Sequence, residues 1–419
     1  MENKKSTPAS QTSVFTGYQK FIILMVAFLQ FSVILDFMVL SPLGAQLLQE
    51  LNITTAQFGM VVSAYALSAG ISGLIAAGFA DKFDRKRMLL VFYVGFFLGT
   101  LFCGLAPGYH YLLVARVITG IFGGVISSIS MAIVTDIFPM EVRGRVMGIA
   151  QMAFAASQVL GLPIGLVLAN HFGWHAPFLM IAGICALVGI GIAFGMKPIR
   201  EHIHLNLGRN PFHHLLATVS HRQYLNGFAA TTLMSTGGFM LMPFGSAFAI
   251  HNMGLTLGDL PVLYTATGVC SIFFGPLIGK LSDRVGRYAV FFWGSILTIV
   301  MVLVYTNQGI TPLWIVIALN VLLFAGISSR MISSQAMMSG VPDPRDRGAF
   351  MSINSSVQYG AGAISSAVAG LIVVQTGNGF IEHYDTLGLV VTVACILTMI
   401  AMFYVNRQVI AKHAASPKA

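Results

Sequence analysis

Long apolar runs constrain this chain more than any other feature of its sequence. From Phe21 onward, runs of about 20 apolar residues follow one another, and each is long enough to cross ~30 Å of hydrocarbon as a helix. Charged residues make up 9% of the 419 positions, against roughly a quarter in soluble domains. The pattern predicts an all-α membrane protein with twelve spans, near residues 20–43, 56–80, 88–107, 111–136, 145–170, 175–197, 223–250, 259–280, 288–306, 312–339, 347–375 and 385–406.

The basic residues predict how these spans are oriented. Apart from Arg116 and Arg330, every Lys and Arg lies in a tail or in alternate loops between spans. Because basic loops stay in the cytoplasm, we expect both termini to be cytoplasmic. Residues 1–19 contain no short apolar core with a cleavage site, so the first span is expected to direct insertion. The net charge of +9 then reflects topology and attraction to anionic lipid heads, and it does not indicate nucleic-acid binding.

A polar stretch near the centre divides the spans into two sets of six. It contains several histidines, but no acid or thiol pattern supports a metal site, and a solvated linker is favoured. The four cysteines are scattered singly and are expected to be reduced packing thiols. The predicted organisation is a cytoplasmic tail (1–19), a six-helix bundle (20–197), a cytoplasmic linker (198–222), a second six-helix bundle (223–406) and a cytoplasmic tail (407–419).

Two phrases recur in the second half of the chain and indicate an internal repeat. "GFADKFDRKRML" begins at Gly78 and "GKLSDRVGRYAV" begins at Gly279, so Asp81 and Asp283 hold equal places in the two copies. "RGRVMG" and "RGAFMS" recur at nearly the same offset. Repeats of equal topology, related by an axis along the membrane normal, are a common build of secondary transporters. A path for a solute is therefore expected between the two halves.

Both loop phrases resemble the signature loop of the major facilitator superfamily, G-x-x-x-D-[RK]-x-G-[RK]-[RK]. The second copy fits fully, whereas the first carries Asp84 where the family usually has Gly. In the family this loop latches the two halves together on the cytoplasmic side. The resemblance implies a carboxylate latch of Asp81, Arg85 and Asp136, with Gly78, Gly279, Asp283 and Arg287 as further loop residues.

Two more phrases resemble the twelve-span, proton-coupled efflux branch of this family. "RVITGIFGG", which begins at Arg116, is similar to the fourth-span motif R-x-x-x-G-x-x-x-[GA]. "GLPIGLVLANHFGWHAPF" is similar to the fifth-span antiporter motif, although His175 replaces the usual arginine. The resemblance implies that Gly161, Pro163 and Gly165 bend this span and pack it against the other half. We expect a monomer in the bacterial inner membrane that needs no cofactor.

Ionisable residues inside the spans are few, and each costs about 3 kcal/mol on insertion scales. Asp36 in the first span and Arg116 in the fourth are expected ~8–10 Å below the outer surface, so they are expected to pair. A proton or a substrate would then compete for Asp36, which is the element that proton-coupled transport needs. A static pair that only orients the helices is the alternative.

Arg330 is the remaining charge inside a span. The second half has no evident acid at equal depth, so we expect Arg330 to face an aqueous cavity and meet an anionic group. Pairing with backbone carbonyls is the alternative. Polar residues at helical spacing are further candidates for the substrate cavity or for interhelical hydrogen bonds: Gln30, Tyr65, Gln158, Gln335, Asn354 and Gln358.

These patterns favour a secondary transporter over an enzyme. The sequence has no nucleotide-binding loop, no His-Glu-x-x-His motif and no nucleophile elbow, so ATP is not expected to drive it. We expect a proton-coupled antiporter that exports a small amphipathic or anionic organic solute by rocking one bundle against the other. The alternatives are a proton-coupled importer of a metabolite, a membrane-embedded enzyme, and a sensor of the same fold that transports nothing.

Overall fold

Helices make up nearly all of the computed structural model, which describes residues 15–77, 79, 82–200, 218–343 and 346–415. The first half (residues 15–200) contains α1 (Gly17–Val39), α2 (Gly44–Glu50), α3 (Thr55–Ala77), α4 (Arg85–Gly104), α5 (Tyr109–Ile137), α6 (Met140–Ala156), the π-helical turn η2 (Ser157–Gly161), α7 (Leu162–Phe172) and α8 (His175–Gly195). The second half (residues 218–415) contains α10 (Arg222–Leu241), the 3-10 turn η4 (Met242–Phe244), α11 (Gly245–His251), α12 (Asp259–Val285), α13 (Arg287–Thr306), α14 (Leu313–Met338), α15 (Arg347–Ile372), the antiparallel strands β1 (Val374–Gln375) and β2 (Ile381–Glu382), and α16 (Tyr384–Ala415).

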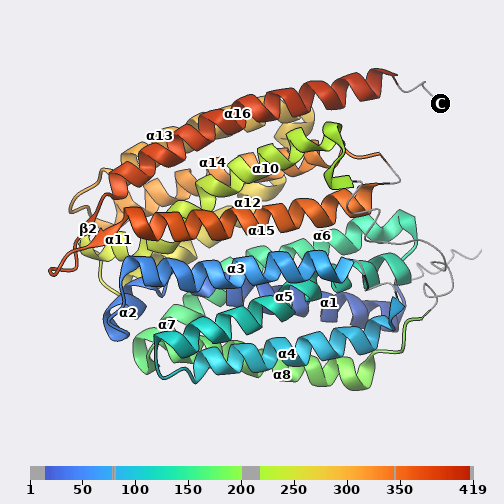
Figure 1. Cartoon of the computed structure of the whole chain (residues 1–419), viewed down its shortest axis with the longest axis horizontal. Coiled ribbons are helices and arrows are strands. Elements are labelled where there is room, and N and C mark those ends of the chain that lie inside the picture. Colours follow the sequence, from blue (N-terminus) through green and yellow to red (C-terminus); the bar gives the residue numbers. More distant parts are fainter. Residues whose placement is uncertain (1–14, 78, 80–81, 201–217, 344–345, 416–419) are drawn as a thin grey trace, which may run out of the picture.

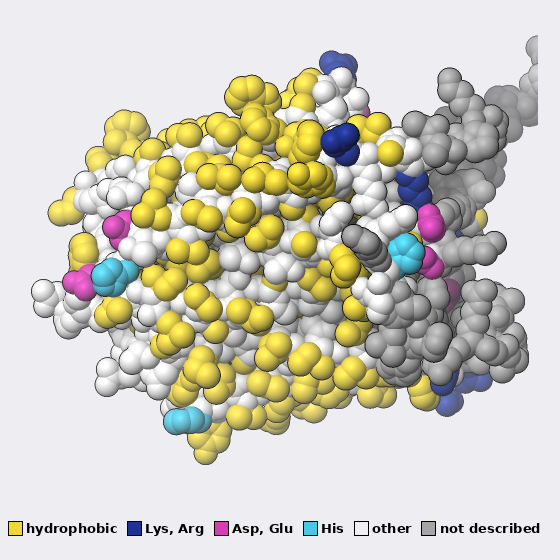
Figure 2. Space-filling view, turned by 45° about the horizontal axis from the view of Figure 1, so that its top comes forward, with side chains coloured by type: hydrophobic (Ala, Val, Ile, Leu, Met, Phe, Trp, Pro, Cys, Tyr) yellow, Lys and Arg dark blue, Asp and Glu magenta, His cyan; other side chains and the backbone are white. Residues whose placement is uncertain are grey.

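The long helices run side by side along the long axis of the molecule, with the two halves of the chain next to each other (Figure 1). One end carries α2, α11 and the β1–β2 hairpin, and we call it the hairpin face. The opposite end, where α1 begins and α16 ends, is the termini face. In Figure 2, hydrophobic side chains cover much of the surface between the two faces, while Lys and Arg gather toward the termini face. This distribution is typical of a protein whose middle is surrounded by lipid.

Within the described ranges, eleven helical stretches are long and apolar enough to cross a membrane. Among the described helices of span length, α15 lies outside this set, because its 26 residues include five Ser, one Asn and one Gln. Some of these polar groups bond the neighbouring α10, since Thr231 donates to Asn354 Oδ1 (2.6 Å) and Ser366 donates to the carbonyl of Phe239 (3.0 Å). The all-α membrane fold is confirmed, and the count of twelve spans stays a prediction.

Prolines interrupt three of the predicted spans. Pro163 has no N–H to offer the carbonyl four residues earlier, and the helix widens there into the π-turn η2. Pro42 follows the end of α1 at Val39, so the first predicted span stops short of residue 43 and the chain re-enters a helix at Gly44. Pro243 lies in η4, between α10 and α11.

The last helix differs from the prediction at its end. The predicted tail from residue 407 is helical as far as Ala415, because "RQVIAKHAA" contains good helix formers and no breaker. Lys412 also bonds the loop before α15, through Asp343 Oδ1 at 2.5 Å. The predicted linker, by contrast, falls largely outside the described residues.

Candidate coupling site and the contacts between the two halves

Asp36 of α1 and Arg116 of α5 form a buried ion pair in the first half. Arg116 Nη1 donates to Asp36 Oδ2 at 2.8 Å and to the Asp36 backbone oxygen at 3.2 Å. The side chain of Asp36 is 0% exposed and that of Arg116 is 1% exposed. Thr100 of α4 donates to the other carboxylate oxygen at 3.2 Å, and the guanidinium lies 4.4 Å from the ring centroid of Tyr65. The structure therefore brings together the two charged residues that the sequence predicts at similar depths in the membrane.

Close packing of α3 against α5 fixes where Arg116 lies. A Cβ at Gly120 would collide with the carbonyl oxygen of Tyr65, and a Cβ at Gly124 would collide with that of Ala69. Because these glycines follow Arg116 at spacings of four, they lie on the same face of α5 and let the two backbones touch. The phrase "RVITGIFGG" thus holds the guanidinium against the Tyr65 ring.

An aromatic cluster between the halves lies beside this pair. Phe37 follows Asp36 in α1, and its ring centroid lies 5.4 Å from that of Tyr65. The same ring lies 5.7 Å from Phe239 of α10 and 6.4 Å from Tyr359 of α15, both in the second half. Sequence analysis missed Phe37 and Tyr359, since one Phe among 31 carries no signal of its position.

The halves are also joined toward the hairpin face. The Ser41 hydroxyl donates to the Met242 carbonyl, and the Ser246 hydroxyl donates to the Ser41 carbonyl at 2.9 Å. Thr55 donates to the carbonyl of Val373 at 2.6 Å. The first contact joins the break after α1 to the break after α10, which are the phrases "SPLGA" and "MPFGS". This second repeat was also missed, although its Pro-x-Gly pattern is visible in the sequence.

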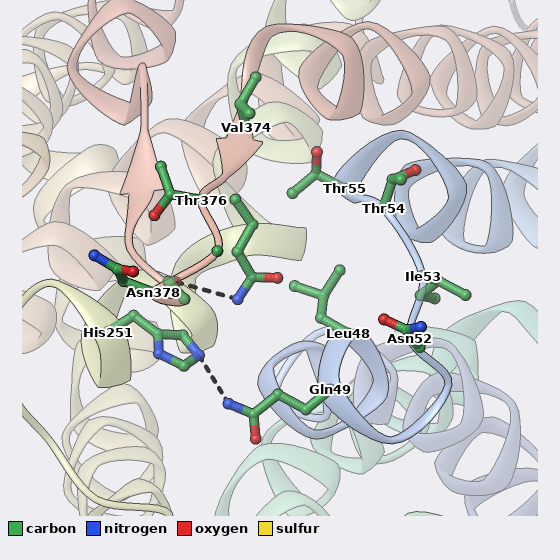
Figure 3. A pocket seen from close by; sticks show the side chains of 13 residues that line it. Leu48, Gln49, Asn52, Ile53, Thr54, Thr55, His251, Val374, Thr376 and Asn378 are labelled. Atoms are coloured by element: carbon green, nitrogen blue, oxygen red, sulfur yellow. Dashed lines mark hydrogen bonds between the residues drawn. The ribbon is translucent and has the colours of Figure 1, made fainter.

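A pocket of about 560 Å³ lies on the hairpin face between the two halves (Figure 3). Gln49 of the first half and His251 of the second half approach each other across it, with Nε2 atoms 3.4 Å apart. The hairpin loop, including Thr376 and Asn378, lines the side opposite α2. Its lining is rich in amide and hydroxyl groups.

On the termini face, Arg85 Nε donates to Asp136 Oδ2 at 3.0 Å, so two of the three predicted latch residues are in contact. Asp81 and Gly78 lie outside the described residues. Asp84, the departure from the family pattern, caps α4 by accepting from the backbone N–H of Lys86 (2.9 Å). It also accepts from Arg200 Nε at 2.7 Å, which ties the loop to the segment after α8.

These partners affect the ionisation of Asp84, which lies just outside the span that begins at Arg85. Burial acts to raise the pKa of Asp84, but the Arg200 guanidinium and the backbone N–H groups of Ile199 and Lys86 outweigh it and hold the pKa below its usual value. The acid that replaces the family's glycine therefore has a structural role in this loop.

The second copy of the loop is arranged differently. Gly279 and Asp283 lie within α12, and Asp283 is exposed. Gly286 ends this helix with φ of 106°, a conformation that favours glycine, and Arg287 donates to the carbonyl of Ala336 in α14 at 3.0 Å. Arg287 therefore caps a neighbouring helix in the second half.

The fifth-span glycines face a different neighbour from the one predicted. Added Cβ atoms at Gly161 and Gly165 would meet side chains of α1, so these glycines pack the span within its own half. The close approach to the other half is made at Gly268 of α12, where a Cβ would lie 3.0 Å from Val159 Cα. The arginine of the family motif is replaced by His175, whose Nε2 lies 3.1 Å from the carbonyl oxygen of Ala106.

The predicted cavity residues fall into two groups. Gln30, Tyr65 and Gln158 are buried, whereas Asn354 and Gln358 are half-buried and Gln335 is exposed. Arg330 differs from its prediction. It is 5% exposed and reaches Cys395 of α16 at 3.1 Å, inside the second half, instead of facing a cavity between the halves.

The comparisons with known proteins agree on one family. The sequence profile described as Major Facilitator Superfamily matches residues 26–244 and 227–419. The uncharacterized MFS-type transporter YceJ of Bacillus subtilis (strain 168) is 28% identical over 373 residues, which cover 87% of this chain and 91% of that protein. A probable sugar efflux transporter of Helicobacter pylori (strain G27) is 22% identical over 372 residues, covering 87% and 92%.

A solved structure has the same fold. It is the crystal structure of a bacterial homolog to the human lysosomal transporter Spinster, in an inward-facing and occupied conformation. The TM-score is 0.69 at 14% sequence identity, and the match covers 96% of this chain and 100% of that one. Fold, helix order and family profile together define a multi-pass membrane transporter. The chain belongs to the major facilitator superfamily, as the loop motifs predict.

Proposed function

We propose that this transporter exchanges a small organic solute for protons, and that Asp36 is the group for which the two compete. One observation carries the proposal. The carboxylate of Asp36 is fully buried beside a guanidinium, and the next residue, Phe37, touches both halves of the molecule. A change of charge at Asp36 therefore occurs one residue away from the surface along which the halves move.

The chemistry of the pair supports this role. Removal from water favours a neutral carboxylic acid, whereas the Arg116 guanidinium and the Thr100 hydroxyl favour the carboxylate. Because these effects oppose each other, a modest change in water access decides whether Asp36 holds a proton. Such a change accompanies the opening and closing of a path between two bundles.

Alternating access requires contacts that form and separate in turn. The hydrogen bonds around Ser41 and the Gln49–His251 contact join the halves on the hairpin face, so they are the ones that must break when that face opens. The Arg85–Asp136 pair on the termini face joins α4 to α5 within the first half, and together with Asp81 it is proposed to latch the second half in the opposite state. Orientation in the bacterial inner membrane follows the predicted cytoplasmic termini.

We assign the solute path to the space between the halves near the Phe37 cluster. Gln335, Asn354 and Gln358 on α14 and α15 are proposed as its polar contacts, because all three side chains are at least partly exposed. Export is favoured over import by the resemblance of the fifth span to antiporters and by the similarity to a sugar efflux protein.

The test uses the purified transporter in proteoliposomes with an imposed pH gradient and an internal pH dye. A panel of amphipathic drugs, neutral sugars and organic acids is screened for solute-induced proton movement. Asp36→Asn preserves the shape of the side chain and is expected to abolish proton movement while solute–solute exchange persists. Asp385→Asn removes an exposed acid at the start of α16 and is the matched control. Solute-driven proton flux at the wild-type rate in Asp36→Asn would refute the proposal.

A further inference from the structure

Arg330 is a buried cation whose partners in the described structure do not neutralise it. Its side chain lies inside the second half, between α10, α13 and α16. Nη1 donates to the Cys395 sulfur at 3.1 Å, and the guanidinium carbon lies 6.0 Å from the centroid of the Phe291 ring. Within the described residues, Nε and Nη2 are buried and have no hydrogen-bond partner.

The sequence offers no carboxylate that can neutralise this charge inside the bilayer. Arg330 lies two turns before the end of α14, about 12 Å from that end. The one acid inside a span, Asp36, is occupied by Arg116 in the other half. A buried charge without a counter-ion is strongly unfavourable, so the site calls for a negative partner. The acids that follow the linker all lie at the ends of helices or in loops: Asp259, Asp283, Asp343, Asp346, Glu382 and Asp385.

The free donors of Arg330 have a defined geometry. Nε and Nη2 lie on the same edge of the planar guanidinium, and their N–H bonds point the same way, which matches two coplanar oxygens of one anion. Two more buried donors on the adjoining helices also have no partner among the described residues. They are the hydroxyls of Ser333, one turn after Arg330, and Thr392, one turn before Cys395.

A small residue of a neighbouring helix lies beside the group. Gly237 of α10 faces the guanidinium, and a Cβ there would lie 4.0 Å from Nη1. The surrounding helices enclose the site, because only 5% of Arg330 is exposed. An occupant must therefore present a small anionic group to Arg330.

We propose that Arg330 binds a small planar anion through its Nε–Nη2 edge, of the class that includes carboxylate and nitrate. The site is separate from the Asp36–Arg116 pair and does not depend on proton coupling. The anion comes either from solution or from the carboxylate of a solute that enters the second half, and the chemistry of recognition is the same in both cases.

The test measures the melting temperature of the full-length protein in detergent at constant pH and ionic strength. Replacing chloride, which cannot supply two parallel acceptors, by formate or nitrate should raise Tm by about 2 °C or more in the wild type through mass action. Arg330→Gln should lose this response. Arg407→Gln removes an exposed charge of α16 and should respond as the wild type does, which controls for general salt effects.

Two further arms sharpen the result. Benzoate distinguishes the sources, since stabilisation by benzoate assigns the site to the carboxylate of a larger solute and its absence assigns it to a small free anion. Arg330→Lys keeps the positive charge but loses the two parallel N–H donors, so formate should raise its Tm no more than chloride does. This variant replaces Arg330→Gln in the test if Arg330→Gln does not fold. An equal formate response in the wild type and either Arg330 variant overturns the proposal, as does no response in the wild type.

Discussion

The two arginines inside the spans are both buried but differ in what balances their charge. Arg116 meets the carboxylate of Asp36 at 2.8 Å, and a ring and two small residues fix its position. Arg330 meets a thiol and the face of Phe291. The difference teaches that the halves of this repeat protein have separate chemistry. The first half holds a buried ion pair, for which we propose proton exchange, whereas the second half holds a cation for which we propose an outside anion.

Breaking the pair in the first half is expected to have the largest effect. Arg116→Gln leaves the Asp36 carboxylate buried without its cation, which costs about 3–5 kcal/mol of stability. Asp36→Asn combined with Arg116→Gln removes both charges and should recover most of the loss. The measurement is the free energy of unfolding in detergent micelles. If the double variant is as unstable as Arg116→Gln alone, charge compensation does not explain the pair.

Separating α3 from α5 is the next largest perturbation. Gly124→Ala places a Cβ against the Ala69 carbonyl, and overpacking of this kind costs about 2 kcal/mol. The shift should also weaken the contact between Arg116 and Tyr65. Gly148→Ala is the matched control, because nothing lies within 4 Å of the added atom in α6. Equal thermal stability of the two variants would show that close approach at Gly124 does not matter.

Removing the charge in the second half should have a small effect, of opposite sign. In chloride buffer, Arg330→Met replaces an uncompensated buried cation by an apolar side chain of similar length, so unfolding should cost about 1 kcal/mol more than in the wild type. Arg407→Met is the control for loss of a positive charge. A loss of several kcal/mol in Arg330→Met would mean that Arg330 has a counter-ion already, and the contrast between the two halves would fail.

The sequence predicts how deep a side chain lies in the membrane better than it predicts which neighbouring helix the side chain faces. Counting residues along a span gives the height of a side chain, so Asp36 and Arg116 were correctly expected to meet. The sequence also places Arg330 inside a span, but it could not tell that this side chain reaches α16. The family, the all-α membrane fold and the loop motifs were predictable because they depend on composition and short-range spacing.

Features that depend on contacts between distant segments were harder to predict. Phe37 became part of the site because Phe239 and Tyr359 pack against it, and no local pattern marks that meeting. The polar composition of α15 keeps it outside the set of apolar helices, and some of its polar groups bond the neighbouring α10. The "SPLGA" and "MPFGS" phrases were visible as a repeat, but only the structure shows that the two copies bond to each other.

A third acid–base pair extends the comparison to the membrane edge. Asp84 and Arg200 are 2.7 Å apart, as close as Asp36 and Arg116, but 54% of the Arg200 side chain is exposed. Water and salt screen such a pair, so its contribution to stability is about 0.5–1 kcal/mol. The two carboxylate–guanidinium pairs are therefore expected to differ severalfold in their contribution to stability, because one is buried and the other is exposed to water.

The pH dependence of this third pair is the smallest effect that we predict. The folded-state pKa of Asp84 lies below its ordinary value of 3.8, so the folded protein binds the proton less readily than the unfolded chain does. The stabilisation is therefore fully present above that ordinary value and is lost as the pH falls through the lower folded-state pKa. Asp84→Asn, which keeps an N-capping side chain, should be less stable than the wild type from pH 8 down to about 5, and the difference should shrink as the pH falls below 3.8 through the lower folded-state pKa. Unfolding free energies measured across this range at low and high salt would check it. A difference that does not shrink at all as the pH falls below 3.8 would mean that hydrogen bonding, and not charge, is what Asp84 contributes to the loop.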